Sequence, residues 1–172
     1  MLQNVMAYEE APYNVVHKGS NFEIRYYEER VVIQTRYNSG SSGFRKLFNY
    51  ISGSNKGEKK IEMTTPVTEL QDGGQMVMQF YLPSRFDKSS APPPADQSLE
   101  IATIEAGYFA VIQYSGFASN KNFNKHTEIL KSSLNLNKIK IISPPIKATY
   151  DGPFTLPNLR RNEAMFLVIW NN

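Results

Sequence analysis

Two stretches of the chain alternate between apolar and polar residues with the two-residue period of a half-buried strand. The first is FEIRYYEERVVIQTRY at residues 22–37, and the second is LEIATIEAGYFAVIQY at residues 99–114. Aligned at one constant spacing, they share four identical pairs: Glu23/Glu100, Ile24/Ile101, Glu28/Glu105 and Tyr37/Tyr114. Each stretch is long enough for two strands, so we predict a β-hairpin in each.

A helical period follows each predicted hairpin. In GFRKLFNYISGSN, residues 43–55, the apolar stripe recurs at helical spacing through Phe44, Leu47, Phe48 and Ile51. Ser41 or Ser42 is the expected N-cap, and Gly53 is the expected stop. The second helix has a weaker stripe, with Ser119 or Asn120 as its cap; the stripe consists of Phe123, Thr127, Leu130 and Leu134.

After each helix we predict a short strand that ends in proline and then a longer apolar strand. The proline-containing segments are MTTPV at 63–67 and ISPPI at 142–146, and the apolar ones are MVMQFYLP at 76–83 and AMFLVIW at 164–170. The order strand, strand, helix, strand, strand therefore occurs twice, over residues of about 20–83 and 97–170. Three successive prolines at 92–94 favour an extended linker within residues 84–98.

The repeat predicts the fold class. Neither half can bury a sheet face alone, so we expect both halves to form one domain over residues 1–172. The expected architecture is α+β, a duplicated unit that forms a twisted, barrel-like antiparallel sheet flanked by two main helices.

Composition narrows the class of protein. Of 172 residues, 41% are hydrophobic and none is cysteine, which excludes disulfides and thiolate metal sites. We find neither a signal peptide nor the roughly 18 unbroken apolar residues of a membrane span, and we expect a cytoplasmic protein. The net charge is +3 with scattered basic residues, and the densest cluster, KGEKK at 56–60, is interpreted as a solvated loop. We therefore expect no nucleic-acid partner.

Candidates for catalysis are scarce. The two histidines, His17 and His126, lie in different halves, and neither has a carboxylate spaced for a proton relay. We interpret both as ordinary strand-edge, loop or helix residues. The chain contains no G-x-S-x-G, P-loop or H-E-x-x-H motif, so an enzyme is not the favoured interpretation.

The first predicted helix combines an apolar stripe with polar flanking residues. Arg45, Lys46 and Asn49 lie beside the stripe that contains Phe44 and Phe48. An apolar surface rimmed by cations suits a flat, apolar ligand that carries carboxylates. The alternative is an ordinary amphipathic helix whose stripe lies in the core.

The segment YDGPFTLPNLRR at residues 150–161 is a second candidate for the wall of a site. It contains Phe154, Leu156 and Arg160 before the last predicted strand. Loops on a rigid scaffold often carry function. The alternative is a proline-stiffened connection between two strands.

These motifs, in this order, resemble the SOUL/heme-binding-protein family over nearly the whole chain, from about Tyr13 to Trp170. The matching stretches are FEIRYY, GFRKLFNYISGSN, KIEMTTPVT at 60–68, the proline-rich linker and RRNEAMFLV at 160–168. The resemblance implies a duplicated α+β fold and non-covalent binding of heme or other porphyrins, without an established reaction for most members. KIEMTTPVT itself is interpreted as part of the architecture.

The resemblance also implies where the ligand lies: on the first helix and near the loop before the last strand. The positions that would face the propionates in one branch correspond to Ser41 and Asn49, so Arg45 and Lys46 are the candidates to substitute for them. In another branch a histidine after Glu-Ile-Arg is the proposed axial ligand, and here that position is Tyr26. Tyrosinate can ligate ferric heme, but Tyr26 also suits an aromatic core position of a strand.

Three functions follow from the resemblance and from the available residues. The leading hypothesis is a heme or tetrapyrrole carrier, buffer or sensor with an apolar cleft and a cationic rim. The alternatives are an enzyme that modifies tetrapyrroles, for example by removing heme iron, and a non-enzymatic module that binds effectors or proteins.

Overall fold

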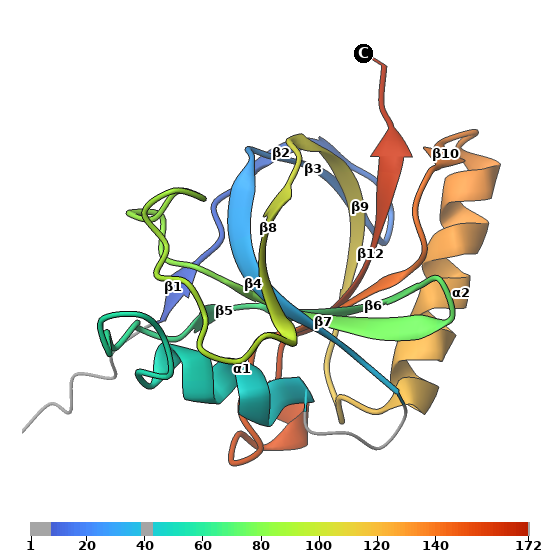
Figure 1. The fold of residues 1–172 in the computed structure, drawn as a ribbon. Coiled ribbons are helices and arrows are strands. Elements are labelled where there is room, and N and C mark those ends of the chain that lie inside the picture. Colours follow the sequence, from blue (N-terminus) through green and yellow to red (C-terminus); the bar gives the residue numbers. More distant parts are fainter. Residues whose placement is uncertain (1–7, 39–42, 172) are drawn as a thin grey trace, which may run out of the picture.

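The computed structural model describes residues 8–38 and 43–171, which form an α+β fold with two main helices beside a large twisted sheet (Figure 1). The elements of the first half are β1 (Glu9–Glu10), β2 (Asn14–Lys18), β3 (Glu23–Tyr27), β4 (Arg30–Tyr37), α1 (Gly43–Ile51), β5 (Thr64–Thr65), β6 (Val67–Asp72) and β7 (Gln75–Tyr81). Those of the second half are β8 (Leu99–Ile104), β9 (Gly107–Tyr114), α2 (Asn120–Leu136), β10 (Lys140–Ile141), β11 (Ile146–Thr149), the 3-10 helix η1 (Pro157–Leu159) and β12 (Asn162–Ile169). The predicted α+β class is confirmed.

The order of strands in the large sheet is pseudo-symmetric. It runs β2-β3-β9-β12-β11-β6-β7-β4-β8, with β10 beside β12. Each strand of the first half corresponds to one of the second: β3 to β8, β4 to β9, β6 to β11 and β7 to β12. If corresponding strands exchange places, and β2 and β10 are left out, the same order is read from the opposite end of the sheet. At the centre β6 pairs antiparallel with β11, and Glu69 lies opposite Lys147.

The two predicted hairpins are wrong. β3 pairs with β9 of the second half, and β4 pairs with β8, so the strands within each expected hairpin are not neighbours. Alternation along a strand determines which side chains are buried, but it does not specify the neighbouring strand. The two halves therefore interlock: β3 of the first half lies beside β9 of the second, and β8 of the second half lies beside β4 of the first.

The sheet twists without closing into a barrel. Its outer strands are β2 and β8, and the hydrogen-bonded order does not join them. Pro66 and Pro145 lie directly before β6 and β11. Pro66 also directly follows the short strand β5, as predicted, whereas residues 142–144 separate Pro145 from β10.

Both helices cover the sheet through buried aliphatic side chains. Leu47 and Ile51 of α1 pack with Ile33, Phe80 and Leu99. The corresponding cluster beneath α2 contains Leu130, Leu134, Ile24, Ala110 and Phe166.

The ends of the helices follow the predicted signals where they are described. Ser119 is the N-cap of α2, because its hydroxyl accepts a hydrogen bond from the backbone N–H of Asn122 at 3.2 Å. Gly53 follows the end of α1 with a φ of +122°, a conformation that favours glycine. Ser41 and Ser42 lie outside the described residues.

The proline-rich segment between the halves packs against α1. The hydroxyl of Tyr50 donates to the carbonyl of Pro92 at 2.8 Å, and the N–H of Lys56 donates to the carbonyl of Pro93 at 2.9 Å. Ala91 is buried in the same place. This segment is therefore held against the first half along part of its length.

Candidate functional site

A cavity of about 430 Å³ lies between α1, the central strands and the start of the loop before β12; we call it the α1 cavity. Apolar residues dominate its wall, among them Phe44, Phe48, Met63, Val67 and Met78. Its volume falls within the range of about 300–1,000 Å³ that is usual for small-molecule sites. The α1 cavity is thus large and apolar enough for part of a flat organic ligand.

The apolar stripe of α1 divides between the core and this cavity. Leu47 and Ile51 are buried, whereas Phe44 and Phe48 remain 49% and 48% exposed. The two phenylalanine rings are nearly parallel, with centroids 6.1 Å apart, and Phe44 also meets Phe80 edge to face at 5.2 Å. Part of the stripe therefore lies in the core and part lines the cavity, because the stripe is wider than the face that the sheet covers.

Three charged residues among those described line the α1 cavity: Glu69 and Lys147 on the two central strands, and Asp151 on the loop before β12. The Lys147 ammonium lies 3.8 Å from a Glu69 carboxylate oxygen and 3.4 Å from the side-chain oxygen of Asn120. Glu69 also accepts a hydrogen bond from the hydroxyl of Tyr37. Burial, together with this hydrogen bond, raises the pKa of Tyr37 above its usual range. The tyrosine therefore stays neutral and keeps one carboxylate oxygen occupied.

The loop that closes one side of the α1 cavity is attached to a buried ionic cluster. Glu163 is fully buried and receives two hydrogen bonds from the guanidinium of Arg25, at 2.9 and 3.0 Å. Arg161 donates to the same carboxylate at 2.9 and 3.1 Å, and the Tyr150 hydroxyl donates at 2.8 Å. Charge-assisted bonds of this kind are strong and directional. They fix both ends of the 150–161 loop.

Tyr150 lines the α1 cavity, but its hydroxyl is committed to this cluster. Burial is the largest cause that raises its pKa far above the usual range, and the negative charge of Glu163 adds to it. A neutral, donating phenol is a poor ligand for iron. We therefore assign Tyr150 a structural role in the wall of the cavity.

The structure places the other predicted site residues outside the α1 cavity. Arg45 and Asn49 are exposed on α1, and the ammonium of Lys46 binds the hydroxyl of Ser98 at 3.0 Å. Phe154 and Leu156 project from the loop into solvent. Of the eight residues expected to contact the ligand directly, the wall contains Phe44 and Phe48.

Arg160 and Tyr26 also have contacts elsewhere. The guanidinium of Arg160 donates to the carbonyls of Thr155 and Pro153, at 2.7 and 2.9 Å, and so braces the loop from within. Tyr26 lies on β3 with its ring 5.2 Å from that of Tyr108, and it does not line the cavity. Its role as an axial ligand stays a prediction.

Sequence reasoning missed the charged pair and part of the apolar wall. Glu69 and Lys147 lie far apart in the chain, and only the pairing of β6 with β11 brings them together. Met63 stands in a motif that was interpreted as architectural. The sequence did contain one signal for the charged pair. Glu69 follows Pro66 and Lys147 follows Pro145, so the two residues have similar positions in the repeat.

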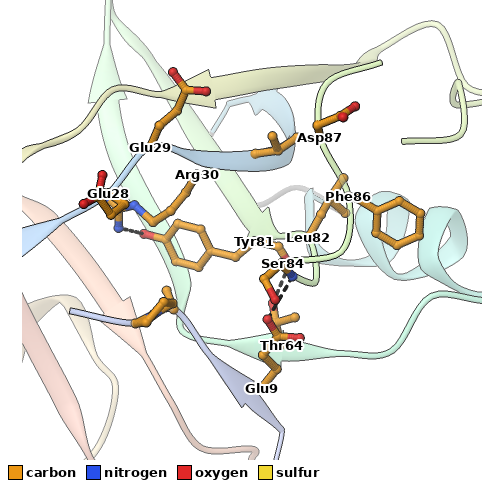
Figure 2. Close-up of a pocket in the computed structure, with 13 residues that line it drawn as sticks. Glu9, Glu28, Glu29, Arg30, Thr64, Tyr81, Leu82, Ser84, Phe86 and Asp87 are labelled. Atoms are coloured by element: carbon orange, nitrogen blue, oxygen red, sulfur yellow. Dashed lines mark hydrogen bonds between the residues drawn. The ribbon is translucent and has the colours of Figure 1, made fainter. Parts of the chain in front are cut away.

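A second cavity, of about 250 Å³, has a different chemical character. Figure 2 shows it between the β3–β4 turn, β7 and the following loop, with the side chain of Arg30 beside Tyr81. The guanidinium packs over the ring of Tyr27 at 4.2 Å and donates to the Tyr81 hydroxyl at 3.3 Å. Four carboxylates also line this cavity, from Glu9, Glu28, Glu29 and Asp87. They would repel a ligand that carries carboxylates.

The histidines have aromatic neighbours in the described part of the chain. Among the described residues, no group of three or more histidine, aspartate or glutamate side chains is placed to hold a metal ion. The ring of His126 stacks on Tyr114 at 4.1 Å, and the ring of His17 lies 5.0 Å from that of Trp170. In the part of the chain that is described, no helix is both long and apolar enough to cross a membrane.

Comparison with known proteins agrees with this architecture. Residues 8–167 match the family model of the SOUL heme-binding protein, and the chain belongs to that family. Heme-binding protein 2 of Mus musculus is 26% identical, over 92% of this chain and 82% of its own length. Heme-binding protein 1 of Xenopus laevis is also 26% identical, over 87% of this chain and 84% of its own length.

Solved structures with the same fold include proteins of other kinds. The C-terminal domain of EcmrR superimposes with a TM-score of 0.64 at 15% identity, and the match covers 91% of this chain and 98% of that domain. A protein described as a hydrolase from Listeria innocua gives a TM-score of 0.62 at 8% identity, over 90% and 94% of the two chains. At such identities the similarity concerns the fold alone.

Proposed function

We propose that this protein binds heme or a related tetrapyrrole non-covalently in the α1 cavity. The observation that carries the proposal is the parallel pair of half-exposed rings, Phe44 and Phe48, on the wall of a cavity of about 430 Å³. A flat macrocycle can cover such rings, and each Å² of apolar surface removed from water stabilises the complex by about 25 cal/mol. Membership of the SOUL family and the names of its heme-binding relatives support heme as the ligand.

Lys147 is the group that would hold a carboxylate of the ligand. Its present contacts, at 3.4 and 3.8 Å, are long, so its N–H groups can turn toward a better acceptor. Glu69 is already bonded to Tyr37, which limits its repulsion of an incoming anion. A second carboxylate of the ligand would extend through the open side of the cavity into water.

The macrocycle, more than the iron, supplies the affinity in this proposal. None of the described residues that line the α1 cavity is a histidine. We therefore expect hemin and metal-free protoporphyrin to bind with affinities within about tenfold of each other, which corresponds to about 1.4 kcal/mol. If Tyr26 ligates iron, the Tyr26→Phe substitution should change the ferric spectrum, and an unchanged spectrum would remove that assignment.

The test is a titration with hemin and with metal-free protoporphyrin, followed by the Soret band and by tyrosine emission. Phe48→Ala should weaken both ligands by about tenfold, because it removes an exposed stacking surface. Leu136→Ala is the matched control, since this side chain is exposed at the far end of α2. Absence of any Soret shift in the wild type at micromolar ligand would overturn the proposal.

A carrier or buffer fits this site better than an enzyme, because its ligand would remain partly open to solvent. We expect bound heme to pass to apomyoglobin, and the rate of that transfer is the measurement. Release of fluorescent metal-free porphyrin from hemin would instead identify removal of iron.

A further inference from the structure

Four large apolar side chains are exposed together beside the α1 cavity. They belong to the loop before α2 and to the loop before β12, and they are 63–98% exposed: Phe117, Phe154, Leu156 and Leu159. We call these four residues the apolar tip. In Figure 1 the loop before β12, with η1, projects below the sheet between α1 and the start of α2.

The two loops of the apolar tip are joined to each other. The N–H of Gly116 donates to the carbonyl of Pro157 at 2.8 Å, and the side-chain amide of Asn162 donates to the carbonyl of Gly116 at 3.0 Å. The guanidinium of Arg160 lies 5.7 Å from the ring of Phe117. The two loops that carry the exposed side chains are therefore held next to each other.

The apolar tip is held in shape before it meets any partner. Arg160 binds two carbonyls within its own loop, and the N–H of Leu159 donates to the carbonyl of Leu156 at 2.9 Å. Pro153 and Pro157 restrict the backbone further. A surface with this much internal support loses little conformational entropy on binding.

The segments around the apolar tip are basic. α1 contains Arg45 and Lys46 and no acid, and the first two turns of α2 contain Lys121 and Lys125 and no acid. The 150–161 loop contributes Arg160. Its one acid, Asp151, accepts a hydrogen bond from the N–H of Arg161 at 2.6 Å. Apolar side chains surrounded by cations complement a bilayer that contains anionic lipids.

We propose that the apolar tip docks on anionic membrane surfaces, with Phe154 and Leu156 inserted among the lipids. The same two loops supply Ala118 and residues 150–153 to the wall of the α1 cavity. Docking therefore brings that cavity to the lipid surface, where apolar macrocycles dissolve. The docking itself requires no ligand, so it can be tested independently of tetrapyrrole binding.

The experiment is co-sedimentation of the ligand-free full chain with vesicles of phosphatidylcholine and phosphatidylserine. We expect the chain to bind these vesicles, and we expect NaCl to weaken the binding. Binding to vesicles of pure phosphatidylcholine should be weaker. The double variant Phe154→Ser/Leu156→Ser should lower the partition coefficient at least about tenfold. Its circular dichroism and thermal midpoint should match those of the wild type, because both side chains already face water.

Leu136→Ser is the control, because this leucine is 82% exposed but lies at the C-terminal end of α2, about 25 Å along the helix from Asn120. It should bind vesicles like the wild type. Failure of the wild type to sediment with anionic vesicles would overturn the proposal, as would equal losses in both variants. A third outcome would overturn the proposal in favour of self-association: the wild type does not bind vesicles but forms a concentration-dependent dimer, and the double variant stays monomeric.

Discussion

Two of the three charged residues described in the wall of the α1 cavity lie on the central strands, and the third, Asp151, lies on the loop before β12. Lys147 and Glu69 face each other across β11 and β6, whereas the helix cations Arg45 and Lys46 lie outside the cavity. The sequence pattern pointed to cations on the flank of α1, whereas the cation in the wall of the cavity is Lys147. A helix wheel shows which residues flank a stripe, but it does not show which strand residues the stripe faces.

At this scale we predict a selective effect of Lys147→Gln. The variant should bind hemin about tenfold more weakly, because it loses a charge-assisted hydrogen bond to a carboxylate. Its affinity for octaethylporphyrin, which has no carboxylates, should stay unchanged. Absorbance titrations of both ligands provide the measurement.

Lys46→Gln is the matched control for that prediction. Its ammonium binds Ser98 outside the cavity, so hemin affinity should remain that of the wild type. The opposite pattern, a loss with Lys46→Gln and none with Lys147→Gln, would favour the cationic helix flank that the sequence suggested.

Among the elements, α1 serves both the core and the α1 cavity. Leu47 and Ile51 contact the sheet, and Phe44 and Phe48 lie one step around the helix, where the sheet no longer covers them. A helix turns by 100° per residue, so adjacent members of a broad stripe can have different environments. The stripe was predictable from the sequence. Which of its residues enter the core and which line the cavity depends on the position of the sheet.

Substitutions on this helix should separate stability from binding. Leu47→Ala should lower the free energy of unfolding by about 2–5 kcal/mol, because it leaves a cavity in the core. Phe48→Ala should lower it by about 1 kcal/mol or less, because half of that side chain is already in water. Urea unfolding measures both losses of stability, and the porphyrin titration measures the separate loss of binding in Phe48→Ala. Equal losses of stability would contradict the division of the stripe.

The 150–161 loop lies beside the α1 cavity, but other residues of the loop than those expected line the wall. Its residues were expected to contact the ligand through Phe154, Leu156 and Arg160. In the structure, residues 150–153 line the cavity, Arg160 braces the loop, and the apolar tip faces outward. The cause is the buried carboxylate of Glu163, which orients both ends of the loop and cannot be recognised from local sequence.

For the whole molecule, the interlocked sheet is the main departure from the predicted hairpins. β3 and β4 follow each other in the chain, yet each pairs with a strand of the second half. Long-range pairing of this kind buries both halves against each other. The halves are therefore expected to depend on each other for stability.

A fragment of residues 1–83 should accordingly fail to fold as a monomer. It lacks β8 and β9, so β4 loses one neighbour and β3 loses the strand that connects it to the sheet. We expect no cooperative urea transition by circular dichroism, and we expect co-expression with residues 84–172 to restore one. A monomeric fragment with a cooperative transition of its own would contradict this prediction.

The sequence by itself determined the local properties of this protein: the periods of its strands and helices, the stop at Gly53, a cap at Ser119 or Asn120 and the motifs of the SOUL family. These depend on neighbours within a few residues, where backbone geometry and capping act. Only the tertiary structure decided which strands pair, where the α1 cavity lies and which lysine faces it. Those features depend on residues that are far apart in the chain and meet only when the central strands pair.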